Sequence, residues 1–293
     1  LEGSSNAETF LNIPQVINVC KEHKIDAVFP GYGFLSENAD FVKQLESHKI
    51  TFIGPHQEAI ASMGDKAVSK KIAQQAEVPV VPGSVGEVAD LEEALKWAEQ
   101  IGYPVLIKAV AGGGGKGMRT CFNEQDLREA FDRVKSEALK SFANDGLLVE
   151  KFIVNPHHIE VQIIANHKGE IFHCYERECS IQRRHQKVIE EATSPFIGDD
   201  QELRQRVCQT AVKLAQKVKY NSAGTVEFIM GEDKQFYFLE MNTRIQVEHP
   251  ITEEITGVDL VRSMVQTAFG EDLDFSKQDE IQMQGHAIEC RIC

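Results

Sequence analysis

The sequence predicts an α/β protein whose first part is a piece of a doubly wound domain, followed by a larger region of mixed strands and helices. Three observations support this fold class. Short apolar strands alternate with amphipathic helices over residues 13–55, two strand-forming segments flank a glycine-rich loop within 103–122, and a long hairpin at 223–244 carries paired carboxylates. Alternating strands and helices are typical of a parallel sheet covered by helices.

The N-terminal region is expected to form that parallel sheet. Strands are predicted within 25–38 and 50–55, and amphipathic helices precede them at 13–23 and 37–47. Ligands gather at the carboxyl ends of parallel strands, so the PGYG segment after the first strand is either a binding loop or a plain turn. Further helices are predicted at 64–76 and 90–101, with a proline-containing linker at 78–84 between them.

The glycine-rich stretch AVAGGGGKGMRT predicts a strand, a loop and a second strand. Gly112, Gly114 and Gly117 satisfy the spacing of a dinucleotide fingerprint, but strand-forming residues follow where that motif needs a helix. Lys116 is followed by glycine and methionine, which excludes a Walker A loop. The remaining interpretations are a lid that donates backbone N–H groups and one lysine to phosphates, or a flexible structural loop.

The segment AGTVEFIMGEDKQFYFLEMNTR (223–244) predicts a hairpin around the turn GEDK. A two- or four-residue loop places Met230 opposite Gln235 and Glu227 opposite Phe238, with Glu240 as a diagonal neighbour of Glu227 on the same face. Asn242 and Arg244 would continue that face, and Phe236 and Phe238 on it would indicate partial burial. An oxygen-rich Glu/Glu/Asn set favours Mg²⁺ between the carboxylates over a solvated hairpin face.

Two further segments concentrate charge. The run SIQRRHQKVIEE contains Arg183, Arg184, His185 and Lys187, for which a surface salt-bridge network is the favoured interpretation. In TRIQVEHPITEEITG, continued strand alternation would put Arg244, Gln246 and Glu248 on one face. A guanidinium and an amide could then fix a small planar oxyanion while the carboxylate takes its proton.

Composition narrows the function classes. The 293 residues are 42% hydrophobic and 26% charged, as in ordinary globular proteins, and the net charge of −14 argues against nucleic-acid binding. No apolar run approaches the roughly 20 residues that span a bilayer. Seven cysteines without small-domain spacing indicate reduced thiols inside a cell. Cys290 and Cys293 form a lone CxxC, and Cys174 and Cys179 lie near two histidines, but buried thiols are favoured over a zinc site.

These stretches, in this order, resemble the biotin carboxylase family of ATP-grasp enzymes over essentially the whole chain. The motifs that carry the resemblance are FPGYGFLSEN, FIGP, MGDKA, IKAVAGGGGKGMR, VEKFI, HIEVQI, RECSIQRRHQKVIEEA, AGTVEFI, FLEMNTRIQVEHPITEEITGVDLV and GHAIECRI. The resemblance implies an α+β ATP-grasp fold with a glycine-rich lid. It implies a partial N-terminal domain and linker helix at 1–80, a lid subdomain at 81–152 and a central catalytic subdomain at 153–293.

The resemblance also implies a reaction and its residues. The family uses ATP, Mg²⁺ or Mn²⁺ and bicarbonate to carboxylate biotin on a carrier protein, through carboxyphosphate. The implied nucleotide-binding residues are Lys66, Lys108, Gly113, Gly114, Gly115, Glu150, Lys151, His158, Gln182 and His185. The implied metal ligands are Glu227 and Glu240, with Asn242 nearby. Lys187, Arg244, Gln246 and the backbone of Val247 would hold bicarbonate, Glu248 matches its base, and Arg291 matches the residue that stabilises the biotin enolate.

Several expectations about the surroundings follow from the resemblance. Phe29 stands where the family usually has histidine, and the first strands and the C-terminal subdomain are expected to be missing. No MKM-like biotinylation site is present, so a separate biotin carboxyl carrier protein or domain and a carboxyltransferase are the expected partners, with a homodimer in the full-length protein. Met241, Thr243 and Pro250 favour the acyl-CoA carboxylase type. The expected location is the cytoplasm, or the mitochondrial matrix or plastid in a eukaryote.

Two alternatives to this function remain at the sequence level. The first is another ATP-grasp ligase, such as a carbamoyl-phosphate or amino-acid ligase, against which the segment from Arg244 to Glu248 argues. The second is a nucleotide-binding module without catalysis, which loss of the metal carboxylates or of Glu248 would have favoured. Both features are intact in the sequence.

Overall fold

The computed structural model describes residues 1–110, 117–142, 144–184 and 186–292. The chain divides into two compact units, and each is treated by itself. The large unit combines 1–79 with 156–293, and the small unit spans 80–155. Among the described residues, no helix is long and apolar enough to cross a membrane. The helix and strand content confirms the predicted fold class.

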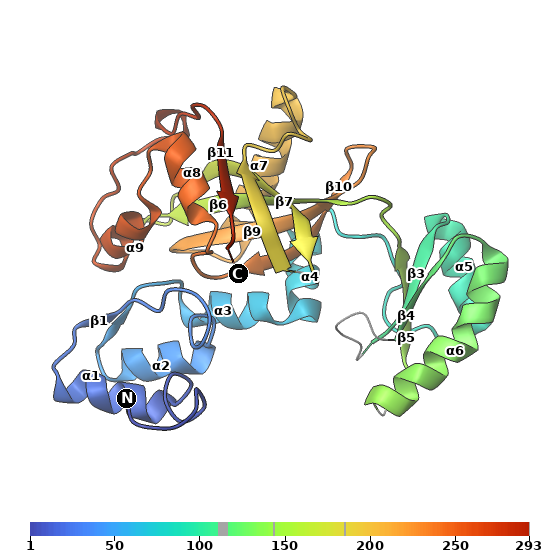
Figure 1. The fold of residues 1–293 in the computed structure, drawn as a ribbon, viewed down its shortest axis with the longest axis horizontal. Coiled ribbons are helices and arrows are strands. Elements are labelled where there is room, and N and C mark those ends of the chain that lie inside the picture. The colour runs from blue at the N-terminus through green and yellow to red at the C-terminus, as the bar shows by residue number, and fades with distance from the viewer. Residues whose placement is uncertain (111–116, 143, 185, 293) are drawn as a thin grey trace. The chain divides into compact units, whose positions relative to one another are not determined.

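The N-terminal part of the large unit contains two short parallel strands and four helices (Figure 1). In chain order these are α1 (Ile13–Glu22), β1 (Ala27–Val28), α2 (Ala39–Ser47), β2 (Thr51–Phe52), α3 (Gln57–Gly64) and α4 (Lys66–Gln75). The parallel pairing of β1 with β2 confirms the predicted sheet. Side chains of Asn12, Asn38 and Asp65 accept backbone hydrogen bonds at the starts of α1, α2 and α4, which explains where these helices begin.

The small unit is a three-stranded antiparallel sheet with two helices. Its elements are α5 (Leu91–Ile101), β3 (Val105–Ala109), β4 (Met118–Cys121), α6 (Glu124–Phe142) and β5 (Leu147–Lys151), with strand order β4-β3-β5. Asn123 accepts a hydrogen bond from the backbone of Asp126, and the side chain of Asp126 accepts one from the backbone of Phe122, which explains where α6 begins. The two strands predicted beside the glycine loop are present, while residues 111–116 lie outside the described part.

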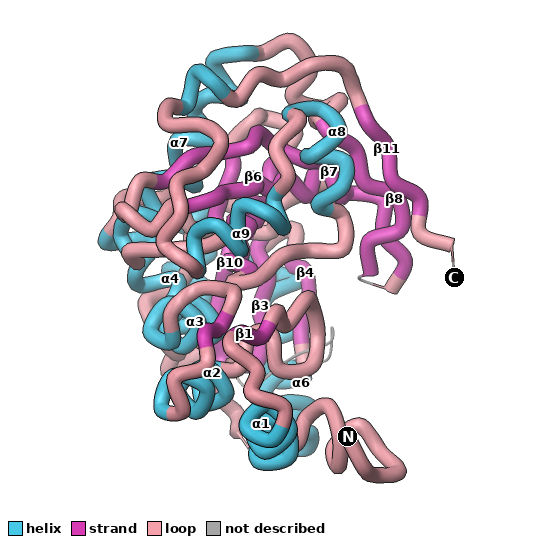
Figure 2. Tube along the Cα trace, turned by 90° about the vertical axis from the view of Figure 1, so that its left-hand side faces the viewer, coloured by secondary structure: helices cyan, strands magenta, loops and turns pink. Residues whose placement is uncertain are grey.

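A six-stranded antiparallel sheet forms the centre of the large unit, in the order β10-β9-β6-β7-β8-β11. Its strands are β6 (His157–Ala165), β7 (Ile171–Arg183), β8 (Gln186–Ala192), β9 (Ala223–Met230), β10 (Phe236–Asn242) and β11 (Ala287–Cys290). The remaining helices are α7 (Gln201–Lys217), α8 (His249–Thr256), α9 (Leu260–Ala268) and the short η1 (Gln278–Glu280). Helix α7 packs against β6 and β7 on one face, here called the α7 face (Figure 2).

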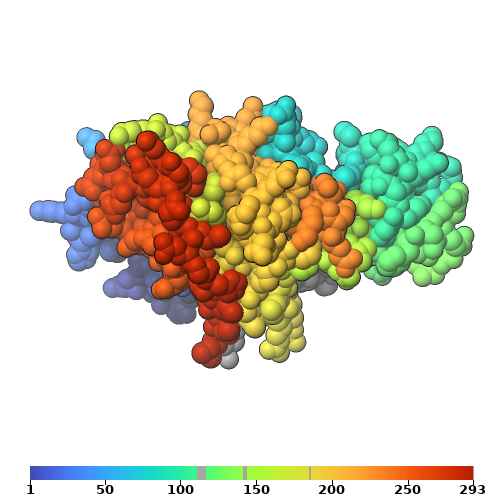
Figure 3. All heavy atoms as spheres, turned by 90° about the horizontal axis from the view of Figure 1, so that it is seen from above, coloured from blue at the N-terminus to red at the C-terminus, as the bar shows by residue number. Residues whose placement is uncertain are grey.

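The other face of this sheet is here called the pocket face. Helix α8 packs against β7, β8 and β11, and α9 packs against β6 and β9. The backbone of β11 pairs with β8, which makes β11 an edge strand of the sheet. In the space-filling view, β11 and the neighbouring β7–β8 hairpin project from the same side of the large unit (Figure 3).

The loop of the β9–β10 hairpin differs from the prediction. It holds five residues, 231–235, so Met230 pairs with Phe236, one residue later than expected. An odd loop length moves every side chain of the second strand to the opposite face. Phe236 and Phe238 are therefore buried beside Phe228 on the α7 face, and their predicted place on the carboxylate face is wrong.

A β-bulge then shifts the register a second time. Pairing jumps from Phe238 to Glu240, which leaves Leu239 as the extra residue. Glu240 consequently lies directly opposite Glu227, so the predicted pairing of Glu227 with Phe238 is also wrong. The conclusion drawn from that pairing still holds, because Glu227, Glu240 and Asn242 do share one face.

Candidate functional site

A pocket of about 860 Å³ lies on the pocket face of the six-stranded sheet. Strands β6 to β10 form its floor and walls, and Tyr32 and Gly33 from the PGYG segment also line it. The sequence alone did not decide whether this segment is a binding loop or a plain turn. In the structure it contributes to the wall of the pocket. The predicted site residues that line the pocket are His158, Gln182, Lys187, Glu227, Glu240, Asn242, Arg244, Gln246, Val247, Glu248 and Arg291.

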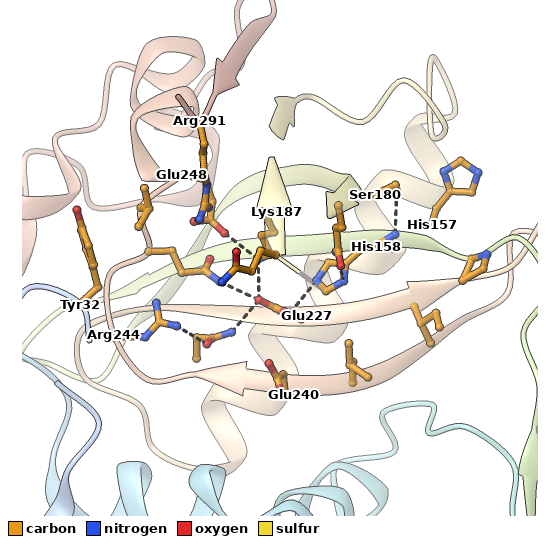
Figure 4. A pocket seen from close by; sticks show the side chains of 18 of the residues that line it. Tyr32, His157, His158, Ser180, Lys187, Glu227, Glu240, Arg244, Glu248 and Arg291 are labelled. Atoms are coloured by element: carbon orange, nitrogen blue, oxygen red, sulfur yellow. Dashed lines mark hydrogen bonds and ion pairs between the residues drawn. The ribbon is translucent and has the colours of Figure 1, made fainter. Parts of the chain in front are cut away.

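The ammonium of Lys187 stands between carboxylates from three elements (Figure 4). Its Nζ donates to Glu227 Oε1 at 2.8 Å and to Glu248 Oε1 at 2.7 Å, and it also pairs with Glu160. Burial opposes the charge of Lys187, but the three carboxylates outweigh that effect and raise its pKa. Lys187 therefore stays a cation and is not part of a surface salt-bridge network.

The carboxylate of Glu227 is the central acceptor of the site. Its Oε1 accepts hydrogen bonds of 2.8 Å from Lys187, Asn242 and Gln246, and its Oε2 lies 2.7 Å from His158 Nε2. Burial alone would raise the pKa of Glu227, yet the hydrogen bond from His158 and the charge of Lys187 outweigh burial and lower it. Conversely, burial opposes the charge of His158, and Glu227 overcomes this and raises the pKa of that imidazole.

Glu240 is exposed, in contrast to its buried partner across the hairpin. The walls of the pocket still remove part of the water around its carboxyl group; this desolvation and the negative charge of Glu227 raise its pKa, while Lys66 opposes the rise. Two carboxylates forced onto adjacent positions of one face repel each other, which a divalent cation between them would relieve. The donor set of carboxylate oxygens with the amide of Asn242 nearby fits Mg²⁺. The residues present are thus compatible with the predicted metal site.

The segment 243–248 follows β10 as a loop, so the strand alternation assumed for Arg244, Gln246 and Glu248 does not occur. The three side chains nevertheless line the same pocket. Arg244 Nε donates to Glu37 Oε2 at 2.8 Å and its Nη2 donates to Asn242 Oδ1 at 2.9 Å. Glu37, near the end of the FPGYGFLSEN stretch, anchors this segment to the N-terminal part of the large unit.

Glu248 is nearly fully buried, with 3% of its surface exposed, and it is held by two cations. Its Oε1 accepts from Lys187, and its Oε2 accepts from Arg291 Nη2 at 2.9 Å. Arg291 follows β11, and its Nε also lies 2.7 Å from Glu190 Oε1. Figure 4 shows Lys187, Glu248 and Arg291 converging from β8, the start of α8 and the end of β11.

Sequence reasoning missed two buried residues beneath this cluster, Glu160 and Arg177. Arg177 Nε donates to Glu160 Oε1 at 2.6 Å, and both side chains have no exposed surface. The signal was present in HIEVQI, because Glu160 lies two residues after His158 and strand alternation puts both on one face. Arg177 lies in RECSIQRRHQK, but its burial depends on packing against α8 and could not be read from that motif.

The other predicted nucleotide-binding residues are placed as follows. In the small unit, Lys108 pairs with Glu150, and Lys151 Nζ donates to the carbonyl oxygens of Gly102 and Tyr103 at 2.9 and 3.1 Å. In the large unit, exposed Lys66 is the first residue of α4, and Gln182 Nε2 donates to the carbonyl oxygen of Cys179 at 2.8 Å. The predicted residues Gly113, Gly114, Gly115 and His185 lie outside the described residues.

Three of the four cysteines singled out in the sequence lie in the described part of the chain. Cys174 and Cys179 are fully buried, and burial raises the pKa of the Cys174 thiol to about 12. These two are buried thiols, as predicted. Cys290 is exposed, which differs from the same prediction, and Cys293 lies outside the described part of the chain.

Comparison with known families identifies this architecture. Residues 1–60 match the family model for the biotin carboxylase N-terminal domain. Residues 65–276 match the family model for the ATP binding domain of the carbamoyl-phosphate synthase L chain. The chain belongs to the biotin carboxylase family. The order of the two matches agrees with the order of the motifs in the sequence.

Individual biotin carboxylase relatives match nearly the whole chain. Biotin carboxylase 2 of Bacillus subtilis is 51% identical over 286 residues, which cover 98% of this chain and 64% of that protein. The propionyl-CoA carboxylase alpha chain of Ruegeria pomeroyi is 52% identical over 285 residues, covering 97% of this chain and 41% of that one. The chain therefore spans less than two thirds of the length of these biotin carboxylase relatives.

A solved structure extends the comparison to bound ligands. It is the biotin carboxylase domain dimer of Hydrogenobacter thermophilus 2-oxoglutarate carboxylase, in complex with ADP, magnesium and bicarbonate. It is 48% identical, with a TM-score of 0.83, and the match covers 99% of this chain and 64% of that one. At this identity the biotin carboxylase fold of the present chain is established.

Proposed function

We propose that the protein carries out the ATP-dependent carboxylation of biotin on a carrier protein, with bicarbonate as the source of carbon. One observation carries the proposal: Glu248 is held between Lys187 and Arg291 in the wall of the pocket that also contains the Glu227–Glu240 pair. Membership of the biotin carboxylase family and the ligands of the Hydrogenobacter relative support it.

In this mechanism Glu248 is the base for bicarbonate. Lys187, Arg244 and the N–H groups of Gln246 and Val247 hold the anion, and the carboxylate of Glu248 takes its proton. Lys187 and Arg291 each hold one oxygen of Glu248, which fixes this carboxylate beside the proposed anion site.

The later steps follow from the charges around the pocket. The carbonate attacks the γ-phosphorus of ATP, forming carboxyphosphate and releasing ADP. Carboxyphosphate breaks down to CO₂ and phosphate, and the phosphate takes the proton from the ureido nitrogen of biotin. Arg291 faces the negative charge that develops on the ureido oxygen, where a fixed cation has its largest effect.

The proposed metal ligands and nucleotide-binding residues complete the mechanism. Glu227 and Glu240 would hold Mg²⁺ or Mn²⁺, which neutralises phosphate charge when bound. Lys66, His158 and Gln182 of the large unit, and Lys108, Glu150 and Lys151 of the small unit, would contact ATP. These roles rest on the family motifs and on the pairings described above.

The whole protein is proposed to work with further components. A biotin carboxyl carrier protein or domain would present biotin, and a carboxyltransferase would pass the carboxyl group to an acyl-CoA. The relative from Hydrogenobacter thermophilus is a dimer, which supports a homodimer here. The proposed location is the cytoplasm, or the mitochondrial matrix or plastid in a eukaryote.

A second candidate is another ATP-grasp ligase. The match of residues 65–276 to the carbamoyl-phosphate synthase ATP binding domain favours it, because that match covers the ATP-grasp region in general. The two candidates differ in their response to biotin.

The deciding experiment measures ADP release by the complete protein in Mg-ATP, with and without bicarbonate and free biotin. Release that requires bicarbonate and rises with biotin supports the carboxylase. ATP cleavage that ignores biotin and responds to ammonia or an amino acid supports the second candidate. If the rate of ATP cleavage does not depend on bicarbonate, the roles proposed for Arg244 in binding the anion and for Glu248 as its base are wrong.

A further inference from the structure

Arg177 lies directly beneath the pocket, and its whole guanidinium group is engaged. Nε donates to Glu160, Nη1 donates to Gln162 Oε1 and Thr252 Oγ1 at 2.8 and 2.9 Å, and Nη2 donates to Thr225 Oγ1 and Gln246 Oε1 at 3.2 and 2.6 Å. The side chain is fully buried and does not line the pocket. It touches the anion site only through other residues.

One of these residues is Gln246, whose amide has a single allowed orientation. Its Oε1 faces the guanidinium of Arg177, and its Nε2 donates to Glu227 Oε1 at 2.8 Å. A guanidinium only donates and a carboxylate only accepts, so a flipped amide would meet a donor with a donor and an acceptor with an acceptor. Within the described residues Nε2 has one acceptor, which leaves its second N–H for a ligand in the pocket.

The second is Glu160, which connects Arg177 to Lys187. Arg177 binds one oxygen of this buried carboxylate at 2.6 Å, and Lys187 binds the other. Burial would raise the pKa of Glu160, but Lys187 and Arg177 together lower it, so the carboxylate stays charged. Arg177 and Lys187 thereby share one buried carboxylate.

We propose that Arg177 is a positioning residue for the anion site: it locks the Gln246 amide so that the pocket presents N–H groups and no carbonyl oxygen to bicarbonate. The inference rests on the proposed function. It requires the effect of Arg177 on bicarbonate to pass through Gln246. Without Arg177, the Gln246 amide loses its strongest orienting partner and can offer its carbonyl oxygen, which repels an anion.

A double-mutant cycle in the complete protein tests this coupling. Arg177→Met, Gln246→Ala and the double variant are compared by the bicarbonate KM, the ATP KM and kcat of biotin-stimulated ADP release. Arg177→Met should raise the bicarbonate KM by about tenfold, the usual loss for a buried charged hydrogen bond, with little change in the ATP KM. In the Gln246→Ala background the same change should leave the bicarbonate KM within about twofold, because the coupled residue is already gone.

Two controls separate positioning from folding. Arg204→Met removes another buried arginine on the α7 face of the same sheet, and its bicarbonate KM should be unchanged. Arg177→Lys keeps a cation opposite Glu160 but cannot reach Glu160 and Gln246 together, so it serves if Arg177→Met does not fold. Nitrogen-15 NMR of the Gln246 side-chain amide, whose two protons should become more exchangeable in Arg177→Lys, gives a readout independent of activity.

The outcomes are distinct. An equal rise of the bicarbonate KM with and without Gln246, or no rise at all, overturns the positioning role while the carboxylase function stands. A wild-type protein whose ATP cleavage ignores bicarbonate refutes the proposed function first. In that case the NMR comparison still decides whether Arg177 orders the amide.

Discussion

The two faces of the six-stranded sheet both bury charge, but they balance it differently. On the α7 face, Arg204 Nε donates to both oxygens of Glu176, at 2.9 and 3.1 Å, so one cation meets one anion. On the pocket face, one ammonium, that of Lys187, is shared by Glu160, Glu227 and Glu248. In the Arg204–Glu176 pair both carboxylate oxygens are bound by the same cation, whereas the cation shared on the pocket face can exchange one of its carboxylates for an incoming anion.

Neighbouring residues build these two arrangements. Glu176 and Arg177 are adjacent on β7, and strand alternation sends one to each face. Burial raises the pKa of Glu176 even though Arg204 opposes this. On the pocket face, by contrast, added cations and hydrogen bonds lower the pKa values of Glu160 and Glu227. The pocket face thus gathers three carboxylates around one cation, at the place where the reaction with anions is proposed.

The largest effect is expected for the pocket face. Glu248→Gln keeps the shape of the side chain but removes the proposed base, so bicarbonate-dependent turnover should fall by roughly 10²- to 10⁴-fold. Binding of Mg-ATP, measured by calorimetry, should persist. Glu176→Gln on the α7 face is the matched control and should leave the bicarbonate KM unaltered; full turnover in Glu248→Gln would remove the base assignment.

On the α7 face, loss of the buried arginine should lower the free energy of unfolding. Arg204→Met leaves Glu176 buried without its cation, and removal of one partner from a buried pair costs about 3–5 kcal/mol of unfolding free energy. Chemical denaturation measures the loss. Pairing Arg204→Met with Glu176→Gln should recover much of it, because no uncompensated charge remains. A wild-type denaturation midpoint for Arg204→Met alone would contradict the comparison.

Lowering the pH should destabilise the folded protein because of His173, whose exposed fraction is 2%. Among the described residues neither ring nitrogen has a hydrogen-bond partner, and burial lowers its pKa to about 4. In the unfolded chain His173 binds a proton below pH 6.5, whereas in the folded protein it binds one only below about pH 4. As the pH is lowered from 6.5 to 4, the free energy of unfolding should therefore fall by about 3 kcal/mol for this one group.

The measurement for His173 compares unfolding free energies at pH 7 and pH 4.5. His173→Phe removes the titrating group at similar volume, so its stability should depend less on pH than that of the wild type. His167→Phe, at an exposed part of the same unit, is the control. An equal pH dependence in wild type and His173→Phe would sink the assignment.

The smallest effect is expected for the exposed carboxylate of the metal pair. Glu240→Gln removes one proposed ligand while Glu227 remains, so the Mg²⁺ concentration for half-maximal activity should rise about tenfold. ADP release across a magnesium titration measures it. Glu232→Gln, in the loop of the same hairpin, provides the control. An unchanged magnesium dependence in Glu240→Gln would refute the metal assignment.

Many of the helices and strands could be predicted from the sequence, because the alternation of apolar and polar residues, the helix caps and the glycine turns each depend on only a few neighbouring residues. The register of the β9–β10 hairpin could not, although the shared face of Glu227 and Glu240 was predicted. The five-residue loop shifts the pairing by one position, and the bulge at Leu239 shifts it by one more. A shift of two positions returns each side chain to the face that was predicted for it. A correct conclusion was thus reached by a wrong register.

The candidate site shows the same limit. Residues inside long motifs were identified, and the pocket collects eleven of those in the large unit, although Lys66 does not line it. The partners that hold them, Glu37, Glu160 and Arg177, come from elements far apart in sequence. Their contacts depend on how the N-terminal part, the sheet and α8 pack together, and no local periodicity reports that packing.

The bulge at Leu239 has a consequence for how this hairpin can vary in length. Deleting Leu239 would turn Glu240 and Asn242 towards α7, whereas inserting one residue between Gly231 and Gln235 would turn Phe236 away from α7 as well. Related chains that keep the carboxylate pair should therefore gain or lose residues here only in twos, or pair each insertion in the loop with loss of the bulge.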